Sequence, residues 1–222
     1  MKQAKSDLFG HPSQAQQTSV GAPRTFRHLP GALSTAEQQT LLGEIDACLA
    51  VAPRFTPTMP RTGKPFSVAM SNAGPLGWVS DRERGYRYQA THPMTGKPWP
   101  PIPATLLGLW KTFADYPFAP EACLINFYVT GAKMGSHVDR DEQDRLAPVL
   151  SVSLGDDAVF HVGGTDRGGR KDRVTLKSGD VLLLEGLSRF AYHGIDRVLA
   201  GTSTLIPGGG RINLTLRRVT VG

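Results

Sequence analysis

The chain has 222 residues, a formal net charge of +6, 25 glycines, 17 prolines and only two cysteines. Two cysteines are too few for a disulfide framework, so we expect Cys48 and Cys123 to be reduced and buried. The sequence shows no signal peptide and no run of about 20 apolar residues, so we expect a cytoplasmic monomer that does not contact a membrane. The length allows one domain over 1–222, and the positive charge is compatible with nucleic acid without requiring it.

The first predicted element is a helix that follows a flexible tail. Residues 1–22 are rich in Gln, Ser, Lys and Pro and lack apolar periodicity, which predicts a mobile tail. Ser34 and Glu37 have capping-box spacing and therefore predict a helix start. The apolar residues that follow at helical spacing are Leu41, Leu42, Ile45, Cys48 and Leu49. We expect this helix to buttress the outside of a sheet.

Residues 54–103 are irregular, basic and aromatic, and loops of this length are usually functional lids. Interleaved rings and cations suit a single-stranded nucleic-acid groove, because bases stack on the rings while the cations follow the phosphates. Trp99 lies between prolines and is interpreted as a core residue. A second helix with an apolar face is predicted over about 104–114.

The last part of the chain, 121–222, predicts a catalytic or binding core made of short strands. Strands are expected to begin near residue 121 and at 149–154, 158–162, 174–177, 181–184 and 212–219. Without βαβ alternation, this pattern indicates a mainly β (α+β) fold, a double-sheet jelly roll with buttressing helices. The glycine-rich run 163–171 lacks the ending of a phosphate loop and is interpreted as a basic hairpin tip.

His137 and Asp139 form a His-x-Asp pair, and His193 follows far downstream. Residues i and i+2 at the end of a strand point to the same side, so the pair can converge on one cation. Two imidazoles and one carboxylate leave three positions open on an octahedral ion, as in mononuclear non-haem Fe(II) enzymes. A His-x-Asp pair by itself could also be two solvent-exposed residues of a loop that bind no metal. If the three residues do bind a metal, the same ligands could hold zinc.

The strand near the C-terminus alternates with period two. Its polar face carries Arg211, Asn213, Thr215 and Arg217. A solvated edge strand would explain a polar face, but two arginines in register favour bidentate recognition of a dicarboxylate. Earlier in the chain, Asn126 and Tyr128 share a strand face just before the His-x-Asp pair.

Together these segments resemble the AlkB family of Fe(II)/2-oxoglutarate-dependent dioxygenases from about Leu33 onward. In the core the matching segments are Leu124–Tyr128, Gly131–Lys133, His137-x-Asp139-x-Asp141-Glu142, Ser151–Gly155, Gly163-Gly164, Gly179–Val181, Tyr192–Ile195 and Arg211-x-Asn213-Leu214-Thr215-x-Arg217. Upstream they are Ser67–Met70, Leu76–Trp78, Gly85-Tyr86-x-Tyr88 and Gly96–Pro100, which are similar to the family's nucleotide-recognition lid.

The resemblance implies a double-stranded β-helix with a lid over 54–103 and a site for Fe(II), 2-oxoglutarate and O2. The implied metal ligands are His137, Asp139 and His193. The implied 2-oxoglutarate partners are Arg217 and Asn126 at the chelating end, with Arg211, Asn213 and Tyr128 at the far carboxylate. The implied substrate contacts are Met70, Trp78, Tyr86 and Asp141, and Arg167 on the hairpin tip is expected to meet DNA phosphate.

The activity implied by the resemblance is oxidative demethylation of 1-methyladenine and 3-methylcytosine in DNA, preferentially single-stranded. It would release formaldehyde, succinate and CO2 and repair alkylated DNA directly. Two alternatives remain at this point. One is an AlkB-like oxygenase acting on RNA or on another substrate, and the other is a non-catalytic jelly-roll binding module.

Overall fold

The computed structural model describes residues 26–222, so the predicted tail 1–22 lies outside the described residues. The elements are β1 (Arg27–Leu29), α1 (Thr35–Val51), β2 (Ala69–Ala73), β3 (Gly77–Asp81), β4 (Gly85–Gln89), α2 (Ala104–Phe113), β5 (Ala122–Tyr128), β6 (Met134–His137), β7 (Val149–Gly155), β8 (Asp157–Val162), β9 (Asp172–Leu176), β10 (Val181–Leu184), a 3-10 turn (Gly186–Ser188), β11 (His193–Leu199) and β12 (Arg211–Arg217).

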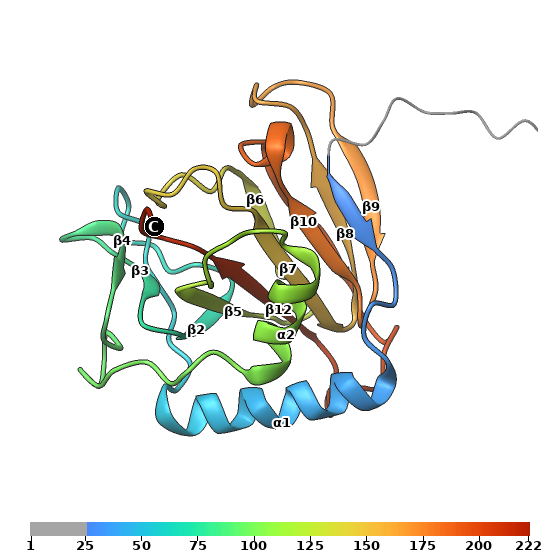
Figure 1. The fold of residues 1–222 in the computed structure, drawn as a ribbon, viewed down its shortest axis with the longest axis horizontal. Coiled ribbons are helices and arrows are strands. Elements are labelled where there is room, and N and C mark those ends of the chain that lie inside the picture. Colours follow the sequence, from blue (N-terminus) through green and yellow to red (C-terminus); the bar gives the residue numbers. More distant parts are fainter. Residues whose placement is uncertain (1–25) are drawn as a thin grey trace, which may run out of the picture.

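Two antiparallel sheets face each other and form the predicted jelly roll (Figure 1). The larger sheet has the order β1-β10-β7-β12-β5-β2 and the smaller one β6-β11-β8-β9, while β3 and β4 form a separate hairpin. The strands predicted over 149–184 are confirmed, although β9 begins earlier, at Asp172. The last strand ends at Arg217 rather than at 219, because the following backbone turns to bind Glu121 through the amides of Val219 and Thr220.

Both predicted helices are confirmed and cover the same face of the larger sheet (Figure 1). Helix α1 begins with the expected capping box, in which Ser34 and Glu37 bond each other's backbone amides. Its buried stripe packs with Trp110 of α2 and with Leu150 and Leu214 of the sheet. No helix among residues 26–222 has the length and apolar character needed to span a bilayer.

Strand β12 lies in the middle of the larger sheet and fixes the orientation of the site. It pairs with β5 on one side and β7 on the other, without a register shift. Ile212, Leu214 and Leu216 point toward the helices and are buried in that core. Because side chains alternate along a strand, the polar residues between them must face the smaller sheet. The apolar row on one face thus fixes where the polar row lies.

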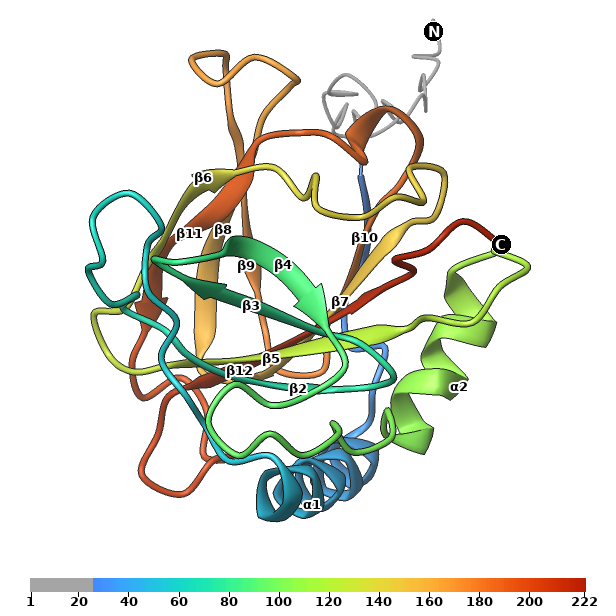
Figure 2. The same ribbon diagram turned by 90° about the vertical axis from the view of Figure 1, so that its left-hand side faces the viewer.

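The region 54–103 is more regular than its composition indicates. It contains β2, which joins the larger sheet beside β5, and the β3–β4 hairpin, which lies in front of β5 and β12 in Figure 2. The sequence of this region shows little alternation of apolar and polar residues. Its strands are held by ladder hydrogen bonds and by polar side chains. Asn72, for example, binds both backbone groups of Trp78. Trp99 is buried in the core, as predicted.

Candidate metal centre and the pocket around it

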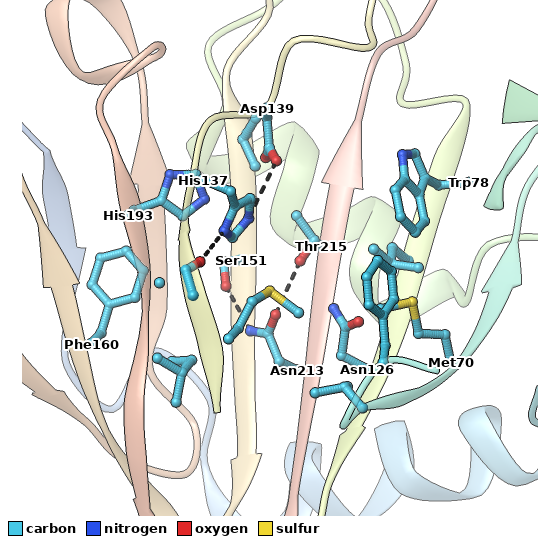
Figure 3. A pocket seen from close by; sticks show the side chains of 18 of the residues that line it. Met70, Trp78, Asn126, His137, Asp139, Ser151, Phe160, His193, Asn213 and Thr215 are labelled. Atoms are coloured by element: carbon cyan, nitrogen blue, oxygen red, sulfur yellow. Dashed lines mark hydrogen bonds and ion pairs between the residues drawn. The ribbon is translucent and has the colours of Figure 1, made fainter. Parts of the chain in front are cut away.

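A pocket of about 370 Å³ lies between the two sheets (Figure 3). Its walls come from the inner faces of both sheets, and side chains of β2, β3 and β4 contribute to one side. The apolar part of the lining includes Val149, Phe160 and Leu184. Nearly all sequence-predicted site residues line this one pocket; the exception is Arg167.

The two predicted histidine ligands are neighbours across a pair of strands. His137 ends β6, His193 begins β11, and the two residues are register partners. Their ring centroids are 4.4 Å apart, and His137 Nε2 lies 3.8 Å from Asp139 Oδ1. Potential ligand atoms of these three residues all lie within 4.8 Å of one another. The expected convergence is therefore present, although Asp139 lies just beyond the strand rather than on it.

The imidazoles are oriented by their own backbone. The Nδ1 atoms of His137 and His193 lie 2.9 Å from the carbonyls of Gly135 and Ala191 respectively. A carbonyl only accepts hydrogen bonds, so each Nδ1 carries a proton and each Nε2 is the ring nitrogen directed away from the backbone, available to a metal. This arrangement fixes the tautomer that a metal requires.

The protonation states of the buried ligands also suit a cation at neutral pH. Burial lowers the pKa of His193 to about 4, with a further lowering from nearby His137, so the imidazole is neutral. Burial by itself would raise the pKa of Asp139, but the neighbouring charge of Arg217 outweighs it and holds that pKa well below its usual range. Arg217 Nη2 lies 2.9 Å from Asp139 Oδ2. A neutral imidazole at His193 and an ionised carboxylate at Asp139 thus face the same point as the His137 ring.

Arg211 is a fully buried cation at the pocket wall, with 1% of its surface exposed. Its Nη2 donates to Ser153 Oγ at 2.7 Å and its Nη1 to the Asp156 carbonyl at 3.3 Å, whereas Nε has no partner. Burial lowers the pKa of Arg211 to about 10, so the group stays charged at neutral pH. Within residues 26–222 it forms no salt bridge with a carboxylate. A buried guanidinium without a counter-charge fits an anionic ligand.

The other predicted co-substrate residues surround this cation. Asn126 Oδ1 is buried without a partner, and the Tyr128 hydroxyl contacts only Met134 Sδ, at 3.6 Å. Burial raises the pKa of Tyr128 to about 12, which keeps the phenol a hydrogen-bond donor. Asn213 is already satisfied, because its amide donates to Ser151 Oγ and the Val152 carbonyl. The unpartnered polar atoms therefore lie at Arg211 and Asn126.

The aromatic residues of the hairpin form a stack at one side of the pocket. Trp78 lies between Phe66 and Tyr86, with ring centroids 6.2 Å and 5.5 Å away and small interplanar angles. Its indole Nε1 donates to Asp141 Oδ2 at 2.7 Å. Met70 is buried and lines the pocket (Figure 3). Of the expected substrate contacts, these four lie together.

Arg167 lies apart from them. It is exposed in the turn between β8 and β9 and does not line the pocket. Its predicted contact with phosphate would therefore lie outside the cavity.

A buried ionic cluster lies beside the predicted metal ligands and was not predicted from the sequence. Glu142, Arg189 and Tyr88 are joined to Arg217 by hydrogen bonds and ion pairs. Glu142 directly follows Asp141 in the segment that resembles the AlkB family. This position was the only indication in the sequence that Glu142 lies near the site. An acidic residue in a loop is normally solvated, so the sequence pattern gave no indication of its burial.

Comparisons with known proteins show which family the whole chain resembles. A sequence model of the 2OG-Fe(II) oxygenase superfamily matches residues 25–217. The alpha-ketoglutarate-dependent dioxygenase AlkB homolog of Caulobacter vibrioides is 52% identical over 189 residues, which cover 85% of each chain. Escherichia coli AlkB is 40% identical over 216 residues, covering 96% of this chain and 97% of its own. The solved structure of OsALKBH1 superposes with a TM-score of 0.73 and 29% identity, over 87% of this chain and 96% of that one.

Proposed function

The chain belongs to the 2OG-Fe(II) oxygenase superfamily and within it to the AlkB dioxygenases, and from this premise we propose that it demethylates 1-methyladenine and 3-methylcytosine in DNA, preferentially single-stranded. The enzyme uses Fe(II) and 2-oxoglutarate. With both bound, the site would supply an oxidation in which O2 is consumed, 2-oxoglutarate is converted to succinate and CO2, and one oxygen atom enters a C–H bond of the N-methyl group. The hydroxymethyl product then releases formaldehyde and the repaired base.

The metal would be held by His137, Asp139 and His193, whose backbone-fixed Nε2 atoms and ionised carboxylate are the required donors. Three ligands on one face leave room for a chelating co-substrate and O2. Arg217 would orient the metal carboxylate and the chelating end of 2-oxoglutarate. The protein would thus contribute position and electrostatics, while the cofactor supplies the oxidation.

The far carboxylate of 2-oxoglutarate would neutralise Arg211. The unpartnered Nε of this arginine is the observation that carries the co-substrate proposal, because a carboxylate accepts the hydrogen bond that the protein leaves unmade. The neutral Tyr128 phenol would donate a second bond, and Asn126 would contact the chelating end by rotating its amide. Asn213 would reach the ligand by giving up its bond to Ser151.

The substrate would enter past the hairpin stack. A methylated base flipped from its strand needs an aromatic face and an acceptor for its exocyclic amine. Trp78 and Tyr86 supply rings, Asp141 supplies the acceptor, and Met70 would pack against the base. Arg167, which lies outside the pocket, would contact the phosphate backbone. Stacking of this kind contributes about 1–3 kcal/mol per base.

The direct test is mass spectrometry of a short oligonucleotide carrying 1-methyladenine. We expect the loss of one methylene mass only when Fe(II) and 2-oxoglutarate are both present, together with an equal yield of formaldehyde. Asp139→Ala is the inactive control. Release of succinate with no change in any oligonucleotide would contradict the substrate proposal while leaving the oxygenase assignment intact.

A parallel panel with methylated RNA and free nucleosides identifies the preferred polymer. One relative, from Schizosaccharomyces pombe, is named tRNA demethylase abh1 and is 32% identical over 83 residues. The metal and co-substrate residues would serve either polymer, so the distinction must come from contacts outside the pocket. Faster turnover on RNA than on DNA would replace the DNA proposal with the RNA alternative.

A further inference from the structure

The β3–β4 hairpin is tied to the loop behind the metal carboxylate at two adjacent points. Trp78 and Tyr88 are partners across the hairpin. Trp78 donates to Asp141, and the Tyr88 hydroxyl donates to Glu142 Oε1 at 2.5 Å. Asp141 is exposed, whereas Glu142 is only 5% exposed. The second tie is therefore a partly buried, charge-assisted hydrogen bond, which is the stronger kind.

Glu142 connects this tie to the co-substrate side of the pocket. Its Oε1 lies 3.3 Å from Arg217 Nε, and its Oε2 accepts from Arg189 Nη2 at 3.1 Å. Arg217 binds Asp139 Oδ2 through both Nε and Nη2, at 3.2 Å and 2.9 Å. Arg189 also donates to the Asp139 carbonyl, at 3.0 Å. An unbroken chain of contacts thus runs from Tyr88 to the metal ligand.

The cluster is balanced in charge and buried, so each member depends on the others. Two carboxylates, Asp139 and Glu142, face two guanidinium groups, Arg189 and Arg217, and all four are buried. Burial raises the pKa of Tyr88 well above its ordinary value, so its hydroxyl remains a donor. Removing one charge from such a cluster leaves another uncompensated in a medium of low dielectric constant. Arg217 would respond by shifting.

We propose that Glu142 is a positioning residue that couples the seating of the β3–β4 hairpin to the binding of 2-oxoglutarate. It holds Arg217 in line with Asp139, and the docked Tyr88 helps to fix Glu142 in that position, so the docked hairpin stabilises the co-substrate site. Thermodynamic linkage makes the effect reciprocal: bound 2-oxoglutarate stabilises the docked hairpin. The inference rests on the proposed function, because it takes Arg217 as a co-substrate anchor.

The chain contains a matched control for a purely structural role. Tyr116 donates to Asp144 Oδ2 at 2.7 Å, in the same loop that carries Glu142. Asp144 caps the amides of Leu146 and Ala147 and has no ion pair with Arg217 among residues 26–222. Tyr116→Phe and Tyr88→Phe therefore remove the same kind of hydrogen bond, and only the second one breaks the chain to the metal ligand.

The first measurement is calorimetric titration of 2-oxoglutarate into protein loaded with Mn(II), without nucleic acid. Glu142→Gln keeps the shape of the side chain but removes its charge, and we expect it to weaken 2-oxoglutarate binding on the order of tenfold. Tyr88→Phe should weaken binding by about threefold, since it breaks one neutral-to-charged bond. Tyr116→Phe should bind 2-oxoglutarate like the wild type.

The second measurement is hydrogen exchange of the backbone amides over 77–89. In the wild type and in Tyr116→Phe, 2-oxoglutarate should slow this exchange; in Tyr88→Phe and Glu142→Gln it should not. Unchanged 2-oxoglutarate affinity in both cluster variants, or equal losses in all three variants, would overturn the coupling. Neither readout uses a nucleic acid, so a wild type that binds 2-oxoglutarate but demethylates no oligonucleotide would refute the substrate proposal only.

Discussion

Replacing Arg211 with methionine should separate the stability of the protein from its ability to bind co-substrate. Burial lowers the pKa of this guanidinium to about 10, against an ordinary value of about 12.5, and this difference corresponds to about 3 kcal/mol. The penalty is present throughout the neutral range and is relieved only as the pH rises above about 10. The charged side chain therefore destabilises the ligand-free fold.

Two hydrogen bonds offset part of that cost. The bonds to Ser153 and to the Asp156 carbonyl contribute about 1 kcal/mol each. Methionine has a similar length and no charge, so Arg211→Met is expected to raise the free energy of unfolding by about 1 kcal/mol. For a protein of this size, that is a rise in Tm of about 2–4 °C.

The assay is thermal unfolding with and without 2-oxoglutarate, in the presence of Mn(II). At a concentration of about 100 times Kd, the ligand should stabilise the wild type by about 2.7 kcal/mol and the variant not at all. The order of the two melting temperatures should therefore reverse on adding the ligand. If Arg211→Met melts below the wild type without ligand and still gains stability from 2-oxoglutarate, then Arg211 neither destabilises the ligand-free fold nor binds the co-substrate.

Arg189→Met is the matched control, because Arg189 is equally buried but fully partnered. Its guanidinium binds Glu142 and the carbonyls of Asp139 and Ala147. Removing this guanidinium takes one of two cations from the buried Glu142 and leaves two carbonyls without their donor, so we expect a loss of about 3–5 kcal/mol. The same substitution should thus stabilise at one buried arginine and destabilise at the other.

Three further predictions concern the metal, pH and the hairpin. Asp139→Ala should weaken Mn(II) binding by more than about 100-fold in a calorimetric titration, since even outer-shell changes cost 10–100-fold; near wild-type affinity would exclude it as a ligand. When the pH is lowered from about 7 to about 4.5, the free energy of unfolding of the metal-free protein, measured by urea denaturation, should fall by about 2–3 kcal/mol. The reason is that burial lowers the pKa of His193 to about 4. Its neutral form is favoured by folding, so the stability is complete above about 6.5 and is lost as the pH falls toward 4; His193→Gln should lack this component. Gly77→Ala would place a Cβ 2.4 Å from Trp99 Cε2 and should cost about 1–3 kcal/mol, with a raised KM for the oligonucleotide only. Gly108→Ala, where nothing lies within 4 Å, should not destabilise.

Local sequence patterns predicted the strands and helices that bury one face, because burial of one face gives the apolar residues a regular spacing. The alternation over 211–217 predicted both the strand and the common face of Arg211 and Arg217, because a helix-covered sheet must be apolar on one side. The Ser34 cap predicted the start of α1 for an equally local reason. The resemblance supplied the pairing of His137 with His193, which lie on partner strands.

The remaining features depend on contacts between distant parts of the chain. The β3–β4 hairpin has little apolar alternation, because both faces of β3 meet the protein: Trp78 lines the pocket, whereas Val79 is buried in the core. Its strands were therefore not predicted. The burial of Glu142 depends on Arg189, Arg217 and Tyr88, which lie far from one another in the sequence. No spacing around Glu142 distinguishes it from a solvated acid. The satisfied state of Asn213 likewise follows from a neighbour on β7.

The two halves of the pocket differ in how their backbones are anchored. The arginine strand β12 has a hydrogen-bonded neighbour on each flank, whereas β3 and β4 pair only with each other. A graft that replaces 77–89 with the corresponding hairpin of a relative would leave the ladder of the larger sheet intact. The preference for a base can therefore change when this hairpin is exchanged, provided that the new hairpin keeps a tyrosine that donates to the buried Glu142.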